Sequence, residues 1–393
     1  MAVSAQADPA VPGPPGGGLT GAEPALWPVV PAATGPRQVA LGQDHPTLDG
    51  LPSLRLTVHE GVVAAGEWVP GHVHRGVEKL FESRDYRQIV MLADRHAWLS
   101  AFCSELGVVI GVERALGMTP PDRAQHLRVA LAELTRIGHH LAFLAALPGE
   151  LSGPWRSTAW AWRTEVLDLI EQATGQRVHP MFAAVGGVRA DVSDGWVDAV
   201  AHAAERWRDR DLLAGELADL LAVDYAGVGV LSADVAQAFG ASGPVLRASG
   251  VDLDLRRDDP SLPYPEDLRV PLGQAGDAAG RIRLLAEEIA VSAGLVAAAA
   301  ESLSALSGQP VSVRLPKVVR VPEGASYTWT EGPGGINGYL LVSRNDRTPW
   351  RMKLRSAGFG NAAALGAALP GTRVEDLPAL VASFLLVCGD VDR

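Results

Sequence analysis

The sequence predicts an α+β fold in which a mainly helical body lies between two regions of β-strand. Near the N-terminus, residues 54–58 and 62–69 form two short strand-like runs around Glu60-Gly61, which is typical of a β-hairpin. In the middle of the chain, an apolar stripe at helical spacing predicts an amphipathic helix: Leu127, Leu131, Leu134, Ile137, Leu141 and Leu144. Near the C-terminus, residues 350–355 alternate between apolar and basic side chains, as in a half-buried strand.

The chain divides into a tail and one domain. Residues 1–38 are rich in Ala, Pro and Gly and carry almost no charge, so we expect a disordered tail. The domain, residues 39–393, is predicted to contain an N-terminal hairpin to residue 75, a helical body over 76–312, and strands with a helix over 313–393.

A charge-rich segment, residues 71–88, follows the hairpin and holds ten ionisable side chains. Read as a helix, it has an apolar face of Val77, Leu80 and Phe81. A second face carries His74, Glu78 and Glu82. So many charges beside a core face either pair in a network or serve a site.

The helical body contains one clear helix start and three further predicted helices. Pro120-Pro121-Asp122 begins the helix with the leucine stripe, because proline suits a first turn and aspartate complements the positive helix end. Further helices are expected at 154–174, 193–223 and 277–306, the last Ala-rich and suited to close packing.

Strands are predicted again from Arg314. Residues 339–343, the turn Asn345-Asp346 and residues 350–355 form a second hairpin. In its second strand the expected buried side chains are Trp350, Met352 and Leu354. A short helix over 374–387 precedes the C-terminus.

Composition excludes several classes of function. The net charge of −11 and pI of about 5.4 argue against a nucleic-acid partner and against a polybasic membrane anchor. Only Cys103 and Cys388 are present, which fits a reducing cytoplasm and excludes a Cys-x-x-Cys metal or iron–sulfur site in this chain. With no secretory pattern and no apolar run near ~20 residues, we expect any membrane association to pass through a partner.

One local pattern imitates a metal site. Gly66, the pair His72-x-His74 and Glu78 resemble the first motif of the cupin barrels, and such a set can bind a divalent metal. However, that motif requires a glycine where Asp85 stands, and Glu78 lies in a helical pattern. We therefore predict no metal site.

Several segments, in order over residues 41–393, carry a more specific resemblance. His74 to Lys79 reads His-Arg-Gly-Val-Glu-Lys, and residues 121–141 contain Arg-Ala, Arg-Val and Glu-Leu-Thr-Arg-Ile-Gly-His-His-Leu. Shorter matches lie at 174–177, 186–188, 246–250 with 254–256, and 389–393. Together they resemble the D-subunit family of NADH-quinone oxidoreductase (respiratory complex I), which is related to the large subunit of nickel–iron hydrogenases.

The resemblance implies a hydrogenase large-subunit-like fold, but not hydrogenase chemistry, because both Cys-x-x-Cys pairs are missing. It implies a peripheral membrane protein on the cytoplasmic side that contacts three partners of complex I: the iron–sulfur B subunit, the C subunit and the membrane anchor subunit. Electrons would pass from NADH through FMN and iron–sulfur clusters of other subunits to quinone, coupled to proton translocation. This chain itself would hold no cofactor.

The resemblance also implies a quinone site shared with the iron–sulfur B subunit. The family holds the headgroup with the second histidine of a His-Pro-x-x-His-Gly loop and the tyrosine of Arg-x-Asp-Tyr. Here the loop begins at His45 but has Asp49 in place of that second histidine, and Trp98 replaces the tyrosine. Quinone reduction consumes two protons. An indole cannot supply one near neutral pH, so Asp49 would be the main donor if burial raised its pKa.

Three further residues complete the predicted site. Arg95 and His179 match family residues beside the partner's cluster, and Glu150 stands near an aspartate that partners the loop histidine. Two functions therefore remain open: a working but modified quinone site, or a non-catalytic or altered-acceptor paralogue that keeps only the assembly surfaces. Asp49 and Trp98 favour the second, whereas Arg95 and His179 favour the first.

Structural roles compete for several of these residues. Glu133, Arg136 and His140, at i, i+3 and i+7, are expected to form a buried polar network rather than a reactive site. The segment from His74 to Lys79 is expected to stabilise the fold and a subunit interface. Asp49 is alternatively a solvated turn residue.

Overall fold

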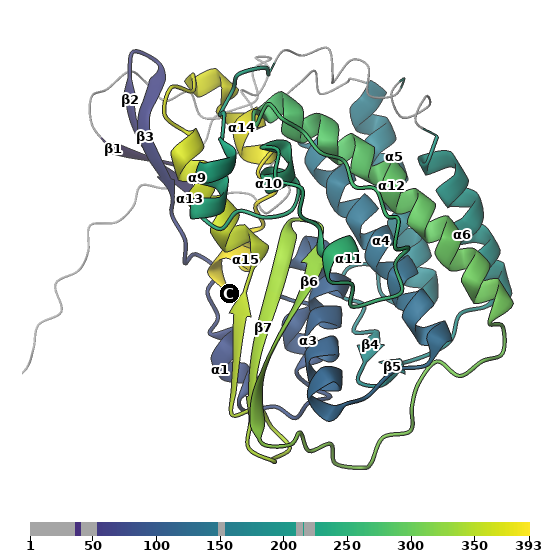
Figure 1. Ribbon diagram of the computed structural model, residues 1–393. Coiled ribbons are helices and arrows are strands. Elements are labelled where there is room, and N and C mark those ends of the chain that lie inside the picture. The colour runs from purple at the N-terminus through teal and green to yellow at the C-terminus, as the bar shows by residue number, and fades with distance from the viewer. Residues whose placement is uncertain (1–35, 41–52, 148–153, 210–214, 216–224) are drawn as a thin grey trace, which may run out of the picture.

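The computed structural model describes residues 36–40, 53–147, 154–209, 215 and 225–393. Its helical body is built from long helices (Figure 1): α3 (Ala101–Leu116), α4 (Asp122–Ala145), α5 (Pro154–Thr174), α6 (Asp194–Trp207) and α12 (Ala278–Ala305). Helix α4 lies in the middle and packs against α3, α5 and α12, while α6 packs against α12. The predicted α+β class with a mainly helical body is confirmed.

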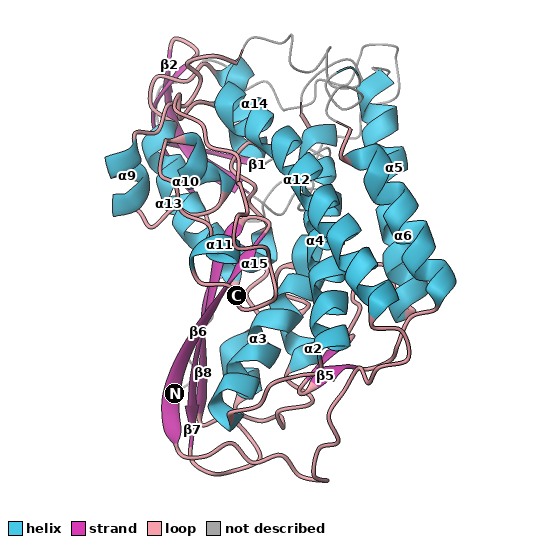
Figure 2. Cartoon of the chain, turned by 45° about the vertical axis from the view of Figure 1, so that its right-hand side comes forward, coloured by secondary structure: helices cyan, strands magenta, loops and turns pink. Residues whose placement is uncertain are grey.

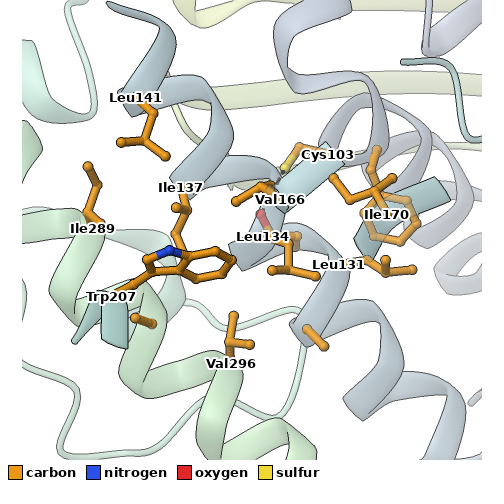
Figure 3. Packing of buried hydrophobic residues seen from close by; sticks show 14 of the residues in the cluster. Cys103, Leu131, Leu134, Ile137, Leu141, Val166, Ile170, Trp207, Ile289 and Val296 are labelled. Carbon is orange, nitrogen blue, oxygen red and sulfur yellow. Dashed lines mark hydrogen bonds between the residues drawn. The ribbon is translucent and has the colours of Figure 1, made fainter. Parts of the chain in front are cut away.

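The core of the body is the predicted leucine stripe of α4 and the helices around it. Leu131, Leu134, Ile137 and Leu141 are at most 1 % exposed. Figure 3 shows them beside Val166 and Ile170 of α5, Ile289 and Val296 of α12, and Trp207 of α6. The helix begins at Asp122 after Pro121, as the sequence predicts. Helices α5 and α12 lie within one residue of their predicted bounds.

Helix α3 was not predicted, and its burial explains why. Its residues from Ala101 to Glu113 are all buried, so it lacks the polar face that makes a helix visible as a periodic pattern. Gly107 allows the C-terminal sheet to approach α3, because a Cβ atom there would lie 2.1 Å from the ring of Tyr339.

Two three-stranded antiparallel sheets lie on the same side of the long helices α4, α5, α6 and α12 (Figure 2). The first has the order β1 (Pro36–Ala40), β2 (Ser53–His59) and β3 (Val62–Trp68). Its β2–β3 hairpin is the predicted one, and both turn residues, Glu60 (φ 50°) and Gly61 (φ 79°), have positive φ as in a type I′ turn. Residues 36–38, placed in the predicted tail, belong instead to β1; residues 1–35 lie outside the described part.

The second sheet has the order β6 (Gly324–Gly332), β7 (Gly335–Ser343) and β8 (Arg351–Arg355). The predicted hairpin is its β7–β8 pair, with Asn345 at φ 57° in the turn. Met352 and Leu354 are buried as expected. Trp350 is not: it precedes β8, is 55 % exposed, and its ring lies 3.3 Å from the guanidinium carbon of Arg344.

Short elements connect these parts. In chain order they are α1 (Val77–Phe81), α2 (Val90–Ala93), the 3-10 helix η1 (Trp98–Ser100), β4 (Ala183–Ala184), β5 (Gly187–Val188), α9 (Ala233–Ala238), α10 (Pro244–Ala248), α11 (Leu255–Asp258), α13 (Ala357–Ala368), the 3-10 helix η2 (Val374–Asp376), α14 (Leu377–Ala382) and α15 (Cys388–Asp392). None of the helices described in residues 77–392 is long and apolar enough to cross a bilayer.

Three predicted helices differ from the observed ones. The helix predicted from His74 begins only at Val77, because Gly76 adopts φ 64°, and Leu80 is 40 % exposed rather than buried. The helix predicted over 193–223 ends at Trp207, and residues 210–214 and 216–223 lie outside the described part. The helix predicted over 374–387 is divided into η2 and α14, and positive φ at Leu385 separates them from α15.

Hydrogen bonds attach the C-terminus to the segment that follows β3. Asp392 accepts hydrogen bonds from the backbone N–H groups of Gly71 (2.7 Å) and Val73 (2.8 Å). Nδ1 of His74 donates to the carbonyl oxygen of Asp392 at 2.8 Å. This contact between residues about 320 positions apart brings α15 to the loop before α1.

Candidate functional site

The buried charges of α4 form the expected polar network. Glu133 pairs with Arg136 (3.1 Å) and with Arg256 of α11 (3.0 Å), and His140 lies 2.9 Å from Glu288 of α12. All five side chains are at most 1 % exposed. The predicted buried polar network of Glu133, Arg136 and His140 is confirmed.

Arg247 of α10 extends this network. It pairs with Glu288, with Asp254 (3.1 Å) and with Glu331 of β6 (3.0 Å). Burial would raise the pKa of Glu288, but Arg247 and His140 outweigh it and hold that pKa well below its usual range. Glu288 is therefore a buried carboxylate whose charge depends on its partners.

The three side chains that imitate a metal motif, those of His72, His74 and Glu78, each contact another part of the protein. His72 contacts the hydroxyl of Ser53 (3.1 Å), whereas Glu78 accepts hydrogen bonds from Lys353 (2.9 Å) and the backbone N–H of Leu354 (2.9 Å). Together with the bond from His74 to the C-terminus, these contacts attach this part of the chain to β8 and α15. Within the described residues, no three His, Cys, Asp or Glu side chains lie close enough to hold a metal ion.

A cavity of about 520 Å³ lies where four distant segments meet. Its polar and aromatic wall consists of Arg75, Arg95, His96, Trp98, His179 and Arg393. Three valines and Gly389 complete the lining. The cavity therefore brings together Arg95, Trp98 and His179 from the predicted site. His45, Asp49 and Glu150, the other predicted site residues, lie outside the described residues.

Arg95 is held in the wall by the residue before it. Its guanidinium donates to the carboxylate of Asp94 (2.5 Å) and to the carbonyl oxygen of Met91 (2.9 Å), and lies 3.7 Å from the sulfur of Met181. Asp94 is buried; burial raises its pKa, while Arg95 acts in the opposite direction. A fixed cation thus faces the cavity with its side chain 35 % exposed.

His179 is oriented by the same residue. Its Nδ1 lies 3.2 Å from the backbone carbonyl oxygen of Asp94, and because a carbonyl can only accept, Nδ1 carries the hydrogen. Its side chain remains 34 % exposed. The other ring nitrogen of His179, Nε2, therefore takes no part in this hydrogen bond.

Glu105 of α3 holds the loop that follows His179. Its carboxylate accepts hydrogen bonds from the backbone N–H groups of Met181 (2.5 Å), Phe182 (2.8 Å) and Ala183 (3.0 Å). Burial raises the pKa of Glu105 to about 8, and the three N–H groups oppose that rise. Glu105 was not among the predicted site residues; its acidic side chain in an otherwise apolar stretch was the available signal.

Trp98 lies between two cores and against the C-terminal helix. It packs on both the core of the helical body and the core beneath β2 and α13. Gly389 of α15 touches it directly, because a Cβ atom at Gly389 would lie 2.2 Å from the indole ring and 2.3 Å from the carbonyl oxygen of His96. The close approach of α15 thus sets the position of this part of the wall.

The charge of the cavity wall is positive although the chain is acidic overall. Arg393 donates to the carbonyl oxygen of Leu354 and stacks on Phe359, and Arg75 lies 3.4 Å from the carbonyl oxygen of Arg95. None of the described residues that line the cavity is acidic. Such a wall favours an electron-rich ligand or a reduced redox centre.

Comparisons with known proteins identify the family. The family described as "Respiratory-chain NADH dehydrogenase, 49 Kd subunit" matches residues 155–319 and 313–393. One D subunit of NADH-quinone oxidoreductase from Salinispora arenicola (numbered 2) is 48 % identical over 90 % of this chain and 93 % of its own length. The D subunit from Clostridium beijerinckii is 32 % identical over 90 % of this chain and 96 % of its own.

A solved structure has the same fold. It is the structure of the membrane-bound sulfane sulfur reductase, an archaeal respiratory membrane complex, with a TM-score of 0.82 and 29 % identity. The match covers 92 % of this chain and 98 % of the other. Fold and relatives together define a subunit of a respiratory oxidoreductase complex. The chain belongs to the 49 Kd subunit family of the respiratory-chain NADH dehydrogenase, the D-subunit family of NADH-quinone oxidoreductase, as its sequence motifs predict.

Proposed function

We propose that this chain forms, with a cluster-bearing partner of the B-subunit type, the quinone-reducing site of an NADH-quinone oxidoreductase. Electrons reach the site from NADH through FMN and iron–sulfur clusters held by other subunits, and their transfer is coupled to proton translocation. The chain is peripheral to the cell membrane on its cytoplasmic side, where it also contacts the C subunit and the membrane anchor subunit.

The observation that carries this proposal is the single cavity that contains Arg95, Trp98 and His179 in its wall. The first and last of these were expected beside the partner's cluster, and Trp98 was expected beside the acceptor. Residues 84 positions apart in sequence thus line one cavity, which supports a site where an electron donor and an acceptor are both close. The arginines of the wall stabilise the negative charge that each electron brings.

The second candidate function is an altered-acceptor role on the same assembly surfaces. Two observations favour it. Trp98 stands where the family tyrosine supplies a proton, and the solved relative of the same fold is named a sulfane sulfur reductase. In this alternative function, the cavity and the electron path are kept, but the electrons are transferred to an acceptor other than quinone.

Replacement of Arg95 with Met tests the electron path. Loss of the fixed cation should lower the midpoint potential of the partner's cluster by roughly 40–90 mV, equal to about 1–2 kcal/mol for unit charges about 8–16 Å apart at an effective dielectric constant of about 20. Redox titration of the assembled complex measures this shift. Arg206→Met, an exposed arginine of α6, is the matched control; an equal potential in both variants contradicts the proposal.

Replacement of Trp98 with Ala separates the two functions. Removal of the aromatic wall should reduce kcat/KM for a short-chain quinone by about 10- to 100-fold, from the roughly 1.5–3 kcal/mol that a large buried apolar side chain contributes. Trp350→Ala, an exposed tryptophan before β8, should leave it unchanged.

Asp49→Asn belongs to the same experiment, because the sequence predicts Asp49 as a proton donor. Quinone reduction that is indifferent to both Trp98→Ala and Asp49→Asn would exclude the quinone site. If activity toward a polysulfide then falls in Trp98→Ala, the altered-acceptor function is supported.

A further inference from the structure

We infer that the buried imidazole of His96, held beside Asp390, is a proton donor to the acceptor bound in this cavity. This inference rests on the proposed function and adds a residue to it. The sequence motif predicts roles for Arg95 and Trp98. It predicts none for His96, which lies between them.

The first observation is that the imidazole ring of His96 is buried and makes no hydrogen bond within the described part of the chain. The residue is 4 % exposed, and neither ring nitrogen has a hydrogen-bond partner among the described residues. A buried polar group left in this way destabilises the folded state. An apolar side chain at position 96 would avoid that cost, so the imidazole is unfavourable for folding alone.

The second observation is a carboxylate placed beside the ring. Oδ1 of Asp390 lies 3.5 Å from Nδ1 of His96 and also lacks a hydrogen bond among the described residues. The other oxygen of Asp390 accepts a hydrogen bond from the backbone N–H of Gly358 at 2.7 Å. That bond fixes the carboxylate, whose charge stabilises the protonated imidazole as a general acid requires.

The third observation is position. His96 belongs to the cavity wall, between Arg95 and Trp98 in the chain. Its backbone is held by Gly389, the neighbour of Asp390, through the close contact with its carbonyl oxygen. The imidazole and its carboxylate are therefore positioned by the same contact between α15 and η1 that positions Trp98.

The charges around His96 act in both directions. Asp390 on α15 and Asp94 on its own segment favour the imidazolium form. Arg95, Arg75, Arg393 and, when protonated, His179 line the same cavity and oppose it.

The partner's iron–sulfur cluster would supply the quinone with two electrons, one at a time. The Nε2–H bond of the His96 imidazolium breaks as an O–H bond forms on one quinone oxygen, which leaves neutral imidazole. The other oxygen takes the second proton from a donor other than His96, ultimately from solvent, and His96 likewise regains its proton from solvent before the next turnover.

His96→Gln in the assembled complex tests the inference, because glutamine keeps a polar side chain of similar size but cannot titrate. With a short-chain quinone as acceptor, kcat should fall at least about tenfold, since general acids contribute about 10²–10⁴-fold. The fall of kcat with rising pH, measured between about pH 5 and 9, should also be lost, while KM changes little. His202→Gln, an exposed histidine of α6, should behave as the wild type.

Asp390→Asn provides a second variant that keeps an acceptor for the Gly358 N–H. Without the carboxylate charge, the imidazolium loses its proton more easily, so the same pH limb should move to lower pH. An unchanged pH limb of kcat in Asp390→Asn contradicts the inference. An unaltered pH profile in His96→Gln also contradicts it, even if the kcat of that variant is lower. If the wild-type complex reduces quinone, the proposed function stands whichever way these variants behave. If the wild-type complex reduces no quinone, both the proposed function and this inference are overturned.

Discussion

Replacing Arg247 with Met should lower the free energy of unfolding by about 3–5 kcal/mol, the cost of leaving buried charges without their partner. Arg247 is fully buried and pairs with Asp254, Glu288 and Glu331 at once. Methionine fills a similar volume but leaves Asp254 and Glu288 without their shared cation. Urea unfolding of the full chain, followed by circular dichroism, measures the loss.

Arg257→Met is the matched control for this prediction. Arg257 lies next to Arg256 and pairs with Asp252 and Asp258, but these pairs are partly exposed to solvent. An exposed ion pair contributes about 0–1 kcal/mol, so the control should unfold close to the wild-type urea concentration. Equal stability of the two variants would show that the Arg247 pairs contribute no more than a surface pair.

Replacing Gly389 with Ala should disturb both stability and activity. The new methyl group would lie 2.2 Å from the indole of Trp98 and 2.3 Å from the carbonyl oxygen of His96. The indole can move but the backbone carbonyl cannot without shifting η1, so α15 must be displaced. We expect a loss of about 1–3 kcal/mol, as for other overpacked cores, and a fall in acceptor reduction of about tenfold or more, because misplacing reacting groups by about 1 Å can cost 10²-fold.

Gly294→Ala distinguishes this steric effect from a general effect of alanine. Gly294 lies inside α12, and a Cβ atom there has no neighbour within 4 Å. Alanine should therefore stabilise that helix by up to about 1 kcal/mol. Thermal unfolding and acceptor reduction, measured for both variants in the assembled complex, give the comparison; normal activity of Gly389→Ala would show that the wall of the cavity tolerates movement of α15.

The local elements of this protein follow from short-range patterns, within clear limits. The β2–β3 turn, α4 and α12 each carry their own signal in turn residues, helix starts or apolar spacing. Helix α3 has no such signal, because a segment that is buried on every side has no polar face. The exposure of Trp350 could not be predicted from local sequence either. The alternation of apolar and basic residues begins at Trp350, one residue before β8.

The candidate site was only partly visible for a similar reason. Glu133, Arg136 and His140 share one helix, so their spacing suggested a network. Their partners Glu288 and Arg256 come from α12 and α11, more than 100 residues away. Helical spacing can reveal which charges share a face, but it carries no information about which segment will neutralise them.

The sequence by itself determined the family, the positions of α4, α5, α12 and the two hairpins, and where the chain keeps the family pattern (Arg95, His179) or departs from it (Trp98). Only the tertiary structure decided that these three residues share one cavity with Arg393, and that His96 and Asp390 face each other beside it. The physical reason is that helix and strand formation depend on neighbours within a few residues. A cavity wall instead depends on packing between distant segments, here through the close contact of Gly389 with η1.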